Sequence, residues 1–157
     1  MQDITPFLWF NDNAEDAINF YVSLFRDAEI RKVKRNGPNM PGKEGTVFSI
    51  EFTLKGLEFM AMNGGPVYQF SEATSFFVNG PTQEEVDRLY DGLAEGGKEL
   101  ACGWVKDRFG VTWQIVPSGM GQLLFSQDAA ASQRAMKAMM QMKKLDINAI
   151  KKAYEGS

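Results

Sequence analysis

The chain has 157 residues, of which 44% are hydrophobic and 24% are charged, and its 17 basic and 20 acidic residues leave a net charge of −3. This is the length and composition of a soluble globular protein, and we expect a single domain over residues 1–157. No block of like charge indicates a nucleic-acid surface, and no apolar run approaches the ~20 residues of a membrane span. We therefore expect neither nucleic acid nor a membrane as a partner.

Two residue counts restrict the chemistry further. Histidine is absent, which removes the commonest metal ligand and the commonest general base at neutral pH. Ser-His-Asp and Cys-His catalysis are removed with it. The single cysteine, Cys102, excludes an internal disulfide, and no N-terminal export signal is recognisable, so we expect a cytoplasmic location.

The first half of the chain predicts a strand, a helix and three more strands. Apolar residues recur at helical spacing over residues 14–25, after the turn Asn11-Asp12-Asn13, which offers an N-cap. Good strand formers or alternating patterns occupy residues 4–10, 29–34, 46–54 and 57–62. The glycine-rich segment 63–66 then predicts a loop.

The second half repeats this order. A strand over residues 74–78 leads to a helix that Thr82 caps, with Glu85 at the capping-box position. Further strands are expected at residues 98–100, 102–105 and 111–116. The sequence therefore predicts an α+β fold with two βαβββ modules, residues 4–63 and residues 74–117.

After Ser118 the composition becomes that of helices. Residues 129–144 are rich in Ala and Met, and Asp146 offers a cap for a last helix over residues 147–154. We expect these C-terminal helices, within residues 126–155, to pack on the sheet or on a partner subunit. Their methionines favour soft apolar packing over a metal or ligand site: Met136, Met139, Met140 and Met142.

One hairpin carries the central functional question. Residues 106–110 predict a turn, in which Gly110 suits a positive φ and Asp107 hydrogen-bonds nearby backbone. The strand that follows is β-branched and aromatic except for Gln114 at its centre. A neutral amide in such a strand either orients a ligand or satisfies a neighbouring backbone group, and the residues leave both interpretations open.

The order of several phrases resembles the vicinal oxygen chelate superfamily, which includes glyoxalase, bleomycin-resistance and dihydroxybiphenyl-dioxygenase proteins. The similarity is greatest to its PhnB-like branch, whose members carry the label 3-demethylubiquinone-9 3-methyltransferase domain. The phrases that carry the resemblance extend over nearly the whole chain: residues 4–10, 17–21, 63–66, 83–87, 96–97, 102–104, 106–117 and 139–146.

The resemblance implies a pocket enclosed by two βαβββ modules, and in metal-dependent members one ligand on each of four strands. Matched by strand position, those ligands fall on or near Pro6, Phe59, Ser75 and Gln114. Proline and phenylalanine cannot ligate a divalent cation, and the other two are weak neutral donors. We therefore expect no metal site and no cofactor. The methyltransferase label also lacks support, because no glycine-rich strand-to-helix turn followed by an acidic residue is present.

Five residues are the candidates for binding a ligand: Gln114, Ser75, Phe77, Cys102 and Trp104. Ser75 and Phe77 share a strand face, and Cys102 lies two residues from Trp104, which predicts one common sheet face for that pair. Core packing is the alternative for each, and an inert buried thiol for Cys102. No catalytic residue is predicted.

Three further residues have structural expectations. Trp9 and Trp113 are expected to pack beneath helices. Glu51 is expected to face outward with Ser49 and Thr53.

The sequence favours a protein that binds a small, partly aromatic molecule in a metal-free pocket. A methyltransferase-type enzyme and an antibiotic-sequestering resistance-type protein are the alternatives, and whether turnover occurs is left open. The resemblance also implies a homodimer.

Overall fold

The computed structural model describes residues 2–156, which divide into two compact units, one ending at Phe70 and the other beginning at Ser71. Each unit contains a four-stranded sheet, with strand orders β1-β4-β3-β2 and β5-β8-β7-β6. In both sheets the first strand of the unit pairs in parallel with the fourth, and the remaining pairs are antiparallel. The two sheets and their helices confirm the predicted α+β fold and its repeated βαβββ order.

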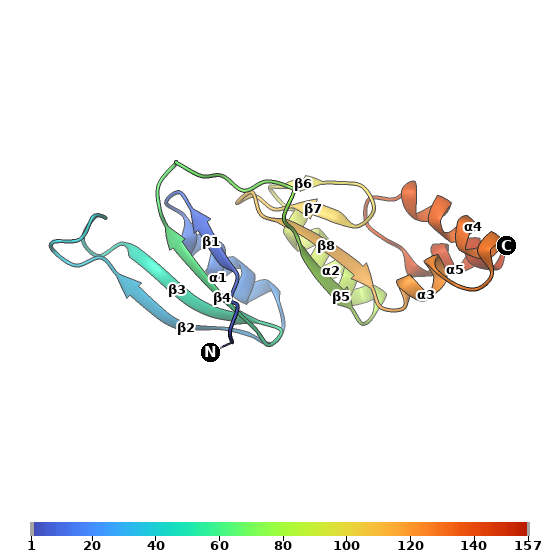
Figure 1. The fold of residues 1–157 in the computed structure, drawn as a ribbon, viewed down its shortest axis with the longest axis horizontal. Helices are drawn as coiled ribbons and strands as arrows, with labels where there is room; N and C mark the ends of the chain where they lie inside the picture. Colours follow the sequence, from blue (N-terminus) through green and yellow to red (C-terminus); the bar gives the residue numbers. More distant parts are fainter. Residues whose placement is uncertain (1, 157) are drawn as a thin grey trace. The chain divides into compact units, whose positions relative to one another are not determined.

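In the first unit one helix covers one face of the sheet (Figure 1). The elements are β1 (Phe7–Phe10), α1 (Ala14–Leu24), β2 (Ala28–Arg35), β3 (Val47–Leu54) and β4 (Leu57–Asn63). The buried stripe of α1 consists of Ala14, Ala17, Ile18 and Tyr21. It packs on a sheet whose buried apolar residues include Phe10, Ile50, Phe52 and Ala61. The other face of this sheet is not covered by α1.

The cap of α1 differs from the prediction. Asn13 occupies the N-cap position, but its side chain makes no capping hydrogen bond. Instead the Ala14 N–H donates to Asn63 Oδ1 at 2.8 Å, and Asn63 Nδ2 donates to the Val47 carbonyl. A residue 49 positions away therefore satisfies one of the N–H groups that every helix start leaves free.

In the second unit α2 covers one face of the sheet (Figure 1). The elements are β5 (Phe76–Gly80), α2 (Gln83–Ala94), β6 (Lys98–Glu99), β7 (Trp104–Lys106) and β8 (Thr112–Pro117). Val86, Leu89 and Leu93 of α2 are fully buried, as is Ile115 of β8. The predicted cap is confirmed, since Thr82 accepts a hydrogen bond from the Glu85 N–H.

The hairpin between β7 and β8 is held by one buried carboxylate. Asp107 is 3% exposed, and its Oδ1 accepts from the N–H groups of Phe109 and Val111. Its Oδ2 accepts from Trp113 Nε1 at 2.9 Å. These bonds fix where β8 begins, and so they set the register of every residue that follows, including Gln114.

Three helices follow the second sheet: α3 (Met120–Leu124), α4 (Ala129–Met140) and α5 (Ile147–Glu155). The short α3 is not among the predicted elements. The helix expected to reach residue 144 ends at Met140, where the N–H groups of Gln141 and Met142 donate to the carbonyls of Ala138 and Met139, and the carbonyls of Met142 and Lys143 then accept from the N–H groups of Cys102 and Gly103. Met139 and Met142 pack around buried Leu145 and Ile150, as the soft-packing interpretation predicts, whereas Met140 is exposed.

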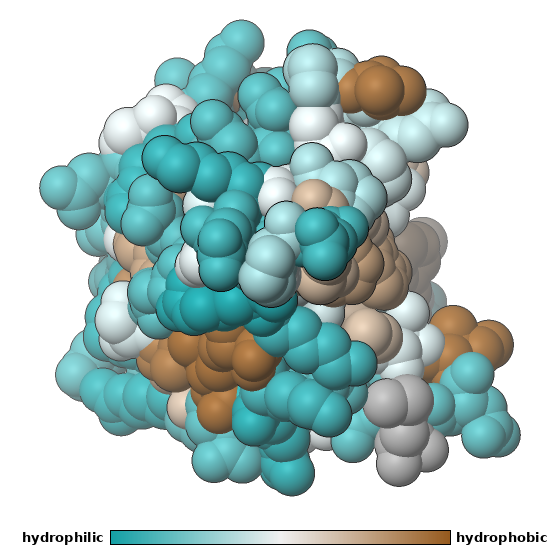
Figure 2. All heavy atoms as spheres, turned by 90° about the vertical axis from the view of Figure 1, so that its left-hand side faces the viewer, coloured by the Kyte–Doolittle hydropathy of each residue, from teal (hydrophilic) through white to brown (hydrophobic). Residues whose placement is uncertain are grey.

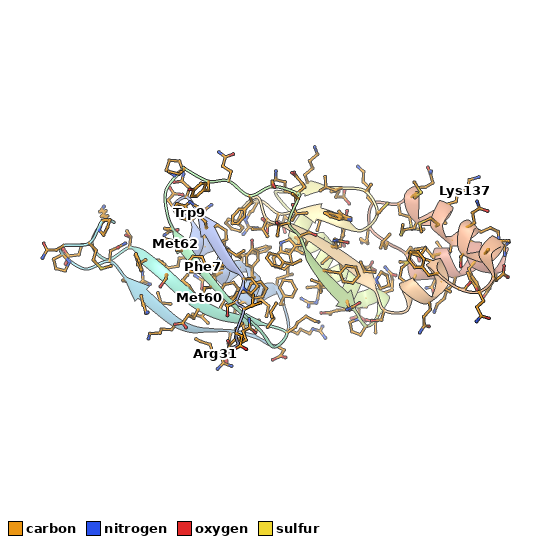
Figure 3. The ribbon with its side chains drawn as sticks, in the orientation of Figure 1. Phe7, Trp9, Arg31, Met60, Met62 and Lys137 are labelled. Atoms are coloured by element: carbon orange, nitrogen blue, oxygen red, sulfur yellow. The ribbon has the colours of Figure 1, made fainter. Side chains whose placement is uncertain are left out.

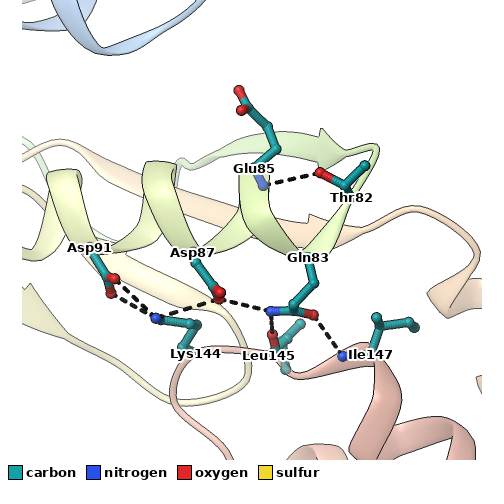
Figure 4. A network of polar contacts seen from close by, with 8 residues as sticks. All are labelled: Thr82, Gln83, Glu85, Asp87, Asp91, Lys144, Leu145 and Ile147. Atoms are coloured by element: carbon teal, nitrogen blue, oxygen red, sulfur yellow. Dashed lines mark hydrogen bonds and ion pairs between the residues drawn. The ribbon is translucent and has the colours of Figure 1, made fainter.

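The segment before α5 binds the polar face of α2 (Figure 4). Gln83 Nε2 donates to the Leu145 carbonyl at 2.8 Å, and Gln83 Oε1 accepts from the Ile147 N–H at 2.9 Å. Lys144 Nζ lies 2.9 Å from an Asp91 carboxylate oxygen, and the hydrogen bond between them raises the pKa of Lys144. The segment between α4 and α5 is thus bound to α2 of the same chain, and the C-terminal helices belong to the second unit.

Among residues 2–156, none of the helices has the length and apolar content needed to cross a membrane.

Candidate functional site

Four of the five predicted ligand-binding residues meet on one face of the second sheet. Gln114 of β8 is the register partner of Phe77 on β5 and of Trp104 on β7. Register partners on neighbouring strands project from the same face of a sheet. Trp113 and Ile115, which alternate with Gln114, are buried on the opposite face, where α2 packs. We call the face that carries Gln114 the open face of the second sheet.

Ser75 joins this row through a direct hydrogen bond. Gln114 Nε2 donates to Ser75 Oγ at 2.9 Å, and both side chains are half-buried. Within the described chain, the Gln114 side chain therefore bonds another side chain and not a neighbouring backbone group. The amide keeps one N–H and its carbonyl oxygen for another partner, and the serine hydroxyl keeps its hydrogen.

Aromatic side chains flank this polar pair. Phe77 is 57% exposed, and Trp104 is half-buried. Thr112 precedes Gln114 by two residues on the same face, and its buried hydroxyl has no hydrogen-bond partner within the described residues. Val116, two residues after Gln114, packs against the apolar cluster of the C-terminal helices. The row therefore combines two aromatic surfaces, a polar centre and a border formed by a helical segment.

The expectation for Cys102 is wrong in its geometry. Strand β7 begins only at Trp104, and Cys102 lies in the preceding turn with φ 59°. Its N–H donates to the Met142 carbonyl, which holds the turn against the C-terminal segment. Because alternation applies only within a strand, the argument that placed Cys102 on the face of Trp104 fails.

One ion pair lies beside the open face. Lys106 Nζ is 3.1 Å from Glu72 Oε1. A hydrogen bond from its own backbone, followed by the bond from Lys106, lowers the pKa of Glu72. The lysine is thereby held as a charged partner of a surface carboxylate.

The first sheet also has an uncovered face, which is absent from the sites predicted from the sequence. Phe7 and Trp9 of β1 are register partners of Met60 and Met62 on β4 (Figure 3). The alternation of Met60 and Met62 with buried Phe59 and Ala61 is the signal in the sequence that indicates this face. Seen from the side nearest this unit, the surface is mainly hydrophilic with separate hydrophobic patches (Figure 2).

Two structural expectations change on this first sheet. Trp9 does not pack beneath α1: its Nε1 donates to the Gly65 carbonyl and its ring meets Tyr68 edge-on, with 5.1 Å between centroids. Trp113, by contrast, is fully buried as expected. Glu51, expected to face outward with Ser49 and Thr53, lines a cavity of about 330 Å³ in this unit, and Ser49 and Thr53 are buried.

The residues do not fit the metal that the resemblance implies. Pro6 precedes β1, and Phe59 stacks on Phe52 in the core with 5.2 Å between ring centroids, and neither side chain carries an atom that could ligate a cation. On the face of the first sheet that α1 does not cover, β1 and β4 present Phe7, Trp9, Met60 and Met62, whose aromatic and thioether groups are not ligands for a hard divalent ion. Within residues 2–156, no three His, Cys, Asp or Glu side chains group as a metal site.

The glycine-rich loop likewise does not fit a nucleotide-like methyl donor. It runs from β4 into further loop and not into a helix. Asn63 caps α1, and Gly64 leaves no room for a Cβ against the Trp9 indole. The loop is accounted for by these packing contacts.

Comparison with known proteins identifies the chain's relatives. The profile of the family described as 3-demethylubiquinone-9 3-methyltransferase matches residues 2–116. A PhnB protein of Bacillus cereus that carries the same description is 40% identical, with a TM-score of 0.71 over 74% of this chain and 100% of its own. No curated protein matches.

Two more distant structures support the fold alone. The fosfomycin resistance protein FosX of Listeria monocytogenes, solved with Mn(II) and sulfate, is 14% identical, with a TM-score of 0.52 over 78% of this chain and 95% of its own. A glyoxalase/bleomycin resistance protein of Albidiferax ferrireducens is 14% identical, with a TM-score of 0.50 over 72% of this chain and 95% of its own. The family match ends before α3, so the C-terminal helices lie outside it.

Proposed function

This chain belongs to the 3-demethylubiquinone-9 3-methyltransferase family, a PhnB-like branch of the vicinal oxygen chelate superfamily, and we propose that it binds a small, planar, neutral and partly aromatic molecule. The binding surface is the open face of the second sheet, and binding requires neither a metal nor a cofactor. The observation that carries the proposal is the Gln114–Ser75 hydrogen bond in a row between two aromatic side chains.

The unused polar groups define the ligand's edge. Gln114 presents a carbonyl oxygen and an N–H side by side. A ligand edge with an N–H next to a carbonyl, as in a lactam, matches both groups at once. Phe77 and Trp104 offer apolar ring surface on the two neighbouring strands, which favours a flat ring system in the ligand.

Neutrality of the ligand follows from the charges near the row. Lys106 of β7, the strand next to Gln114, is already paired with Glu72, and its register partner Lys98 is exposed on β6, one strand farther away. A charged ligand at Gln114 would lose hydration without gaining a free counter-charge on the adjoining strands, which is unfavourable in a partly buried site. Small-molecule sites of this kind are mostly apolar with a few oriented polar groups.

The proposal includes a homodimer in the cytoplasm, as the family resemblance implies. Light scattering of the purified protein tests the dimer: a molar mass near that of one 17.6 kDa chain would contradict it.

A pair of simple heteroaromatic probes tests the site while the natural ligand is unidentified. 2-Quinolinone has an N–H next to a carbonyl, and quinoline has the same ring size with a nitrogen acceptor only. We expect 2-quinolinone to bind the wild type about tenfold more tightly than quinoline, since the extra hydrogen bonding contributes roughly 1 kcal/mol. Dissociation constants are measured by ligand-observed NMR.

The variant Gln114→Leu removes the amide and keeps a side chain of similar length. In this variant the preference for 2-quinolinone over quinoline should disappear, and Gln122→Leu, an exposed glutamine of α3, should preserve it. If Gln114→Leu still bound 2-quinolinone about tenfold more tightly than quinoline, the Gln114 amide would not be the group that recognises the lactam edge, and the proposal would be refuted.

A further inference from the structure

The first unit contains a second candidate site, whose chemistry differs from that of the open face of the second sheet. Its cavity of about 330 Å³ is lined only by residues of the first unit, among them Lys32, Glu51 and Met60. This volume is at the small end of the range for ligand pockets. We infer that this cavity binds a small zwitterion that carries an ammonium group, a carboxylate and an apolar side chain, such as a free amino acid.

The sheet register places opposite charges together in this cavity. Lys32 of β2 and Glu51 of β3 are register partners, so their side chains project from the same face of the sheet. Met60 of β4 is the register partner of Glu51 on its other side. A cation, a carboxylate and a thioether thus lie in one row across three strands.

Among the described residues, neither Lys32 nor Glu51 has an ion-pair or hydrogen-bond partner for its side chain, although they are direct register partners. The other two charged side chains of the cavity already make polar contacts. Arg31 pairs with Glu29 at 3.1 Å, and a Glu58 carboxylate oxygen accepts one hydrogen bond from a neutral donor, the Gln2 N–H, at 3.0 Å. Lys32 and Glu51 are therefore the two charged side chains of the described lining that have no other polar contact.

These two groups match the two ends of an amino acid. The ligand's carboxylate would accept from Lys32, and its ammonium would donate to Glu51; both are charge-assisted hydrogen bonds. Met60 and its register partner Phe7, which is 51% exposed, offer apolar surface to the ligand's side chain (Figure 3). A thioether adapts to different apolar shapes, which suits aliphatic and aromatic side chains alike.

Three probes separate the two charges. L-Leucine carries both, L-leucine methyl ester carries only the ammonium, and N-acetyl-L-leucine carries only the carboxylate. Binding to the full chain is measured by titration calorimetry. We expect leucine to bind about tenfold more tightly than either analogue, because each analogue loses one charge-assisted hydrogen bond.

Two variants assign each charge to its partner. Lys32→Met should abolish the difference between leucine and its methyl ester while preserving the difference between leucine and N-acetyl-leucine, and Glu51→Gln should do the reverse. Lys34→Met is the matched control, because Lys34 lies two residues further along β2, opposite Ser49, and does not line the cavity. A thermal midpoint near that of the wild type verifies that each variant is folded.

Several outcomes would overturn the inference. They are no binding of leucine, methionine or phenylalanine by the wild type, equal affinity for all three leucine probes, or probe differences that persist in both variants. None of these results depends on Gln114, so the inference about this cavity and the proposed function of the second sheet are tested independently.

Discussion

The carboxylate of Asp107 should be the most sensitive single group in the hairpin that carries Gln114. Asp107 is 3% exposed and Trp113 is 1% exposed, and Oδ2 of the first accepts from Nε1 of the second at 2.9 Å. In Asp107→Asn the new NH₂ group faces either the indole N–H or the two backbone N–H groups of the turn. In both orientations at least one buried donor loses its acceptor.

The magnitude follows from the count of bonds. An unpaired buried donor costs roughly 1–3 kcal/mol, and the remaining hydrogen bonds weaken because their acceptor is no longer charged. We expect Asp107→Asn to lower the free energy of unfolding by about 2–4 kcal/mol. For a chain of this length that corresponds to a fall of roughly 5–15 °C in the melting temperature.

The assay is urea denaturation followed by far-UV circular dichroism. Asp12→Asn is the matched control: Asp12 is exposed, and its substitution should change the unfolding free energy by less than about 0.5 kcal/mol. If Asp107→Asn were as stable as Asp12→Asn, the account of how the hairpin is held would be refuted.

Three further predictions concern the two cores and the C-terminal segment. Burial, followed by the charge of Glu99, raises the pKa of Tyr90 to about 12, so on raising the pH the unfolded state loses the phenol proton before the folded state does. The free energy of unfolding should therefore fall as the pH rises from about 10 to about 12. Tyr90→Phe should remove the part of this fall that the phenol causes. Gly64→Ala places a methyl group against the Trp9 indole and should cost about 1–3 kcal/mol, measured by urea denaturation. Leu145→Ala opens a cavity in the apolar cluster of the C-terminal helices and should cost about 2–5 kcal/mol in the same assay.

Each of these predictions has a control or a contradicting result. If the free energy of unfolding depended on pH in the same way in the wild type and in Tyr90→Phe, the pKa of the phenol would not be raised in the folded state. Gly37→Ala adds a methyl group where no atom lies within 4 Å, and it should be nearly neutral; an equal loss in both glycine variants would contradict the close contact at Gly64. Leu57→Ala, at a position that is 42% exposed, should cost far less than Leu145→Ala.

The repeated architecture could be predicted because it depends on local patterns. The alternation in residues 46–54 and the Thr82–Glu85 cap indicate elements through nearest neighbours alone, and the structure contains both. The cap of α1 could not be predicted in the same way. Asn63 lies far along the chain, and only the tertiary fold brings its side chain to the start of α1.

In the candidate site, too, features set by local sequence could be predicted, and features set by contacts between distant segments could not. The turn residues Asp107 and Gly110 determine the register of β8, so the position of Gln114 in the strand could be predicted from the sequence. Cys102 could not be placed correctly because its turn is bound to the carbonyl of Met142, a contact between distant segments of the chain. The charged cavity of the first unit could not be predicted because its row depends on the pairing of three strands, which no single strand pattern reveals.

The central claim is that the Gln114 amide on the open face of the second sheet contacts a planar ligand. The most direct measurement is a ¹⁵N–¹H NMR titration of the glutamine and asparagine side-chain amides with 2-quinolinone, with the Gln114 pair assigned from Gln114→Leu. The account predicts that the Gln114 side-chain signals shift and saturate together with ligand binding, while those of Gln122 stay in place. Saturable binding that leaves the Gln114 side-chain signals unmoved would contradict it.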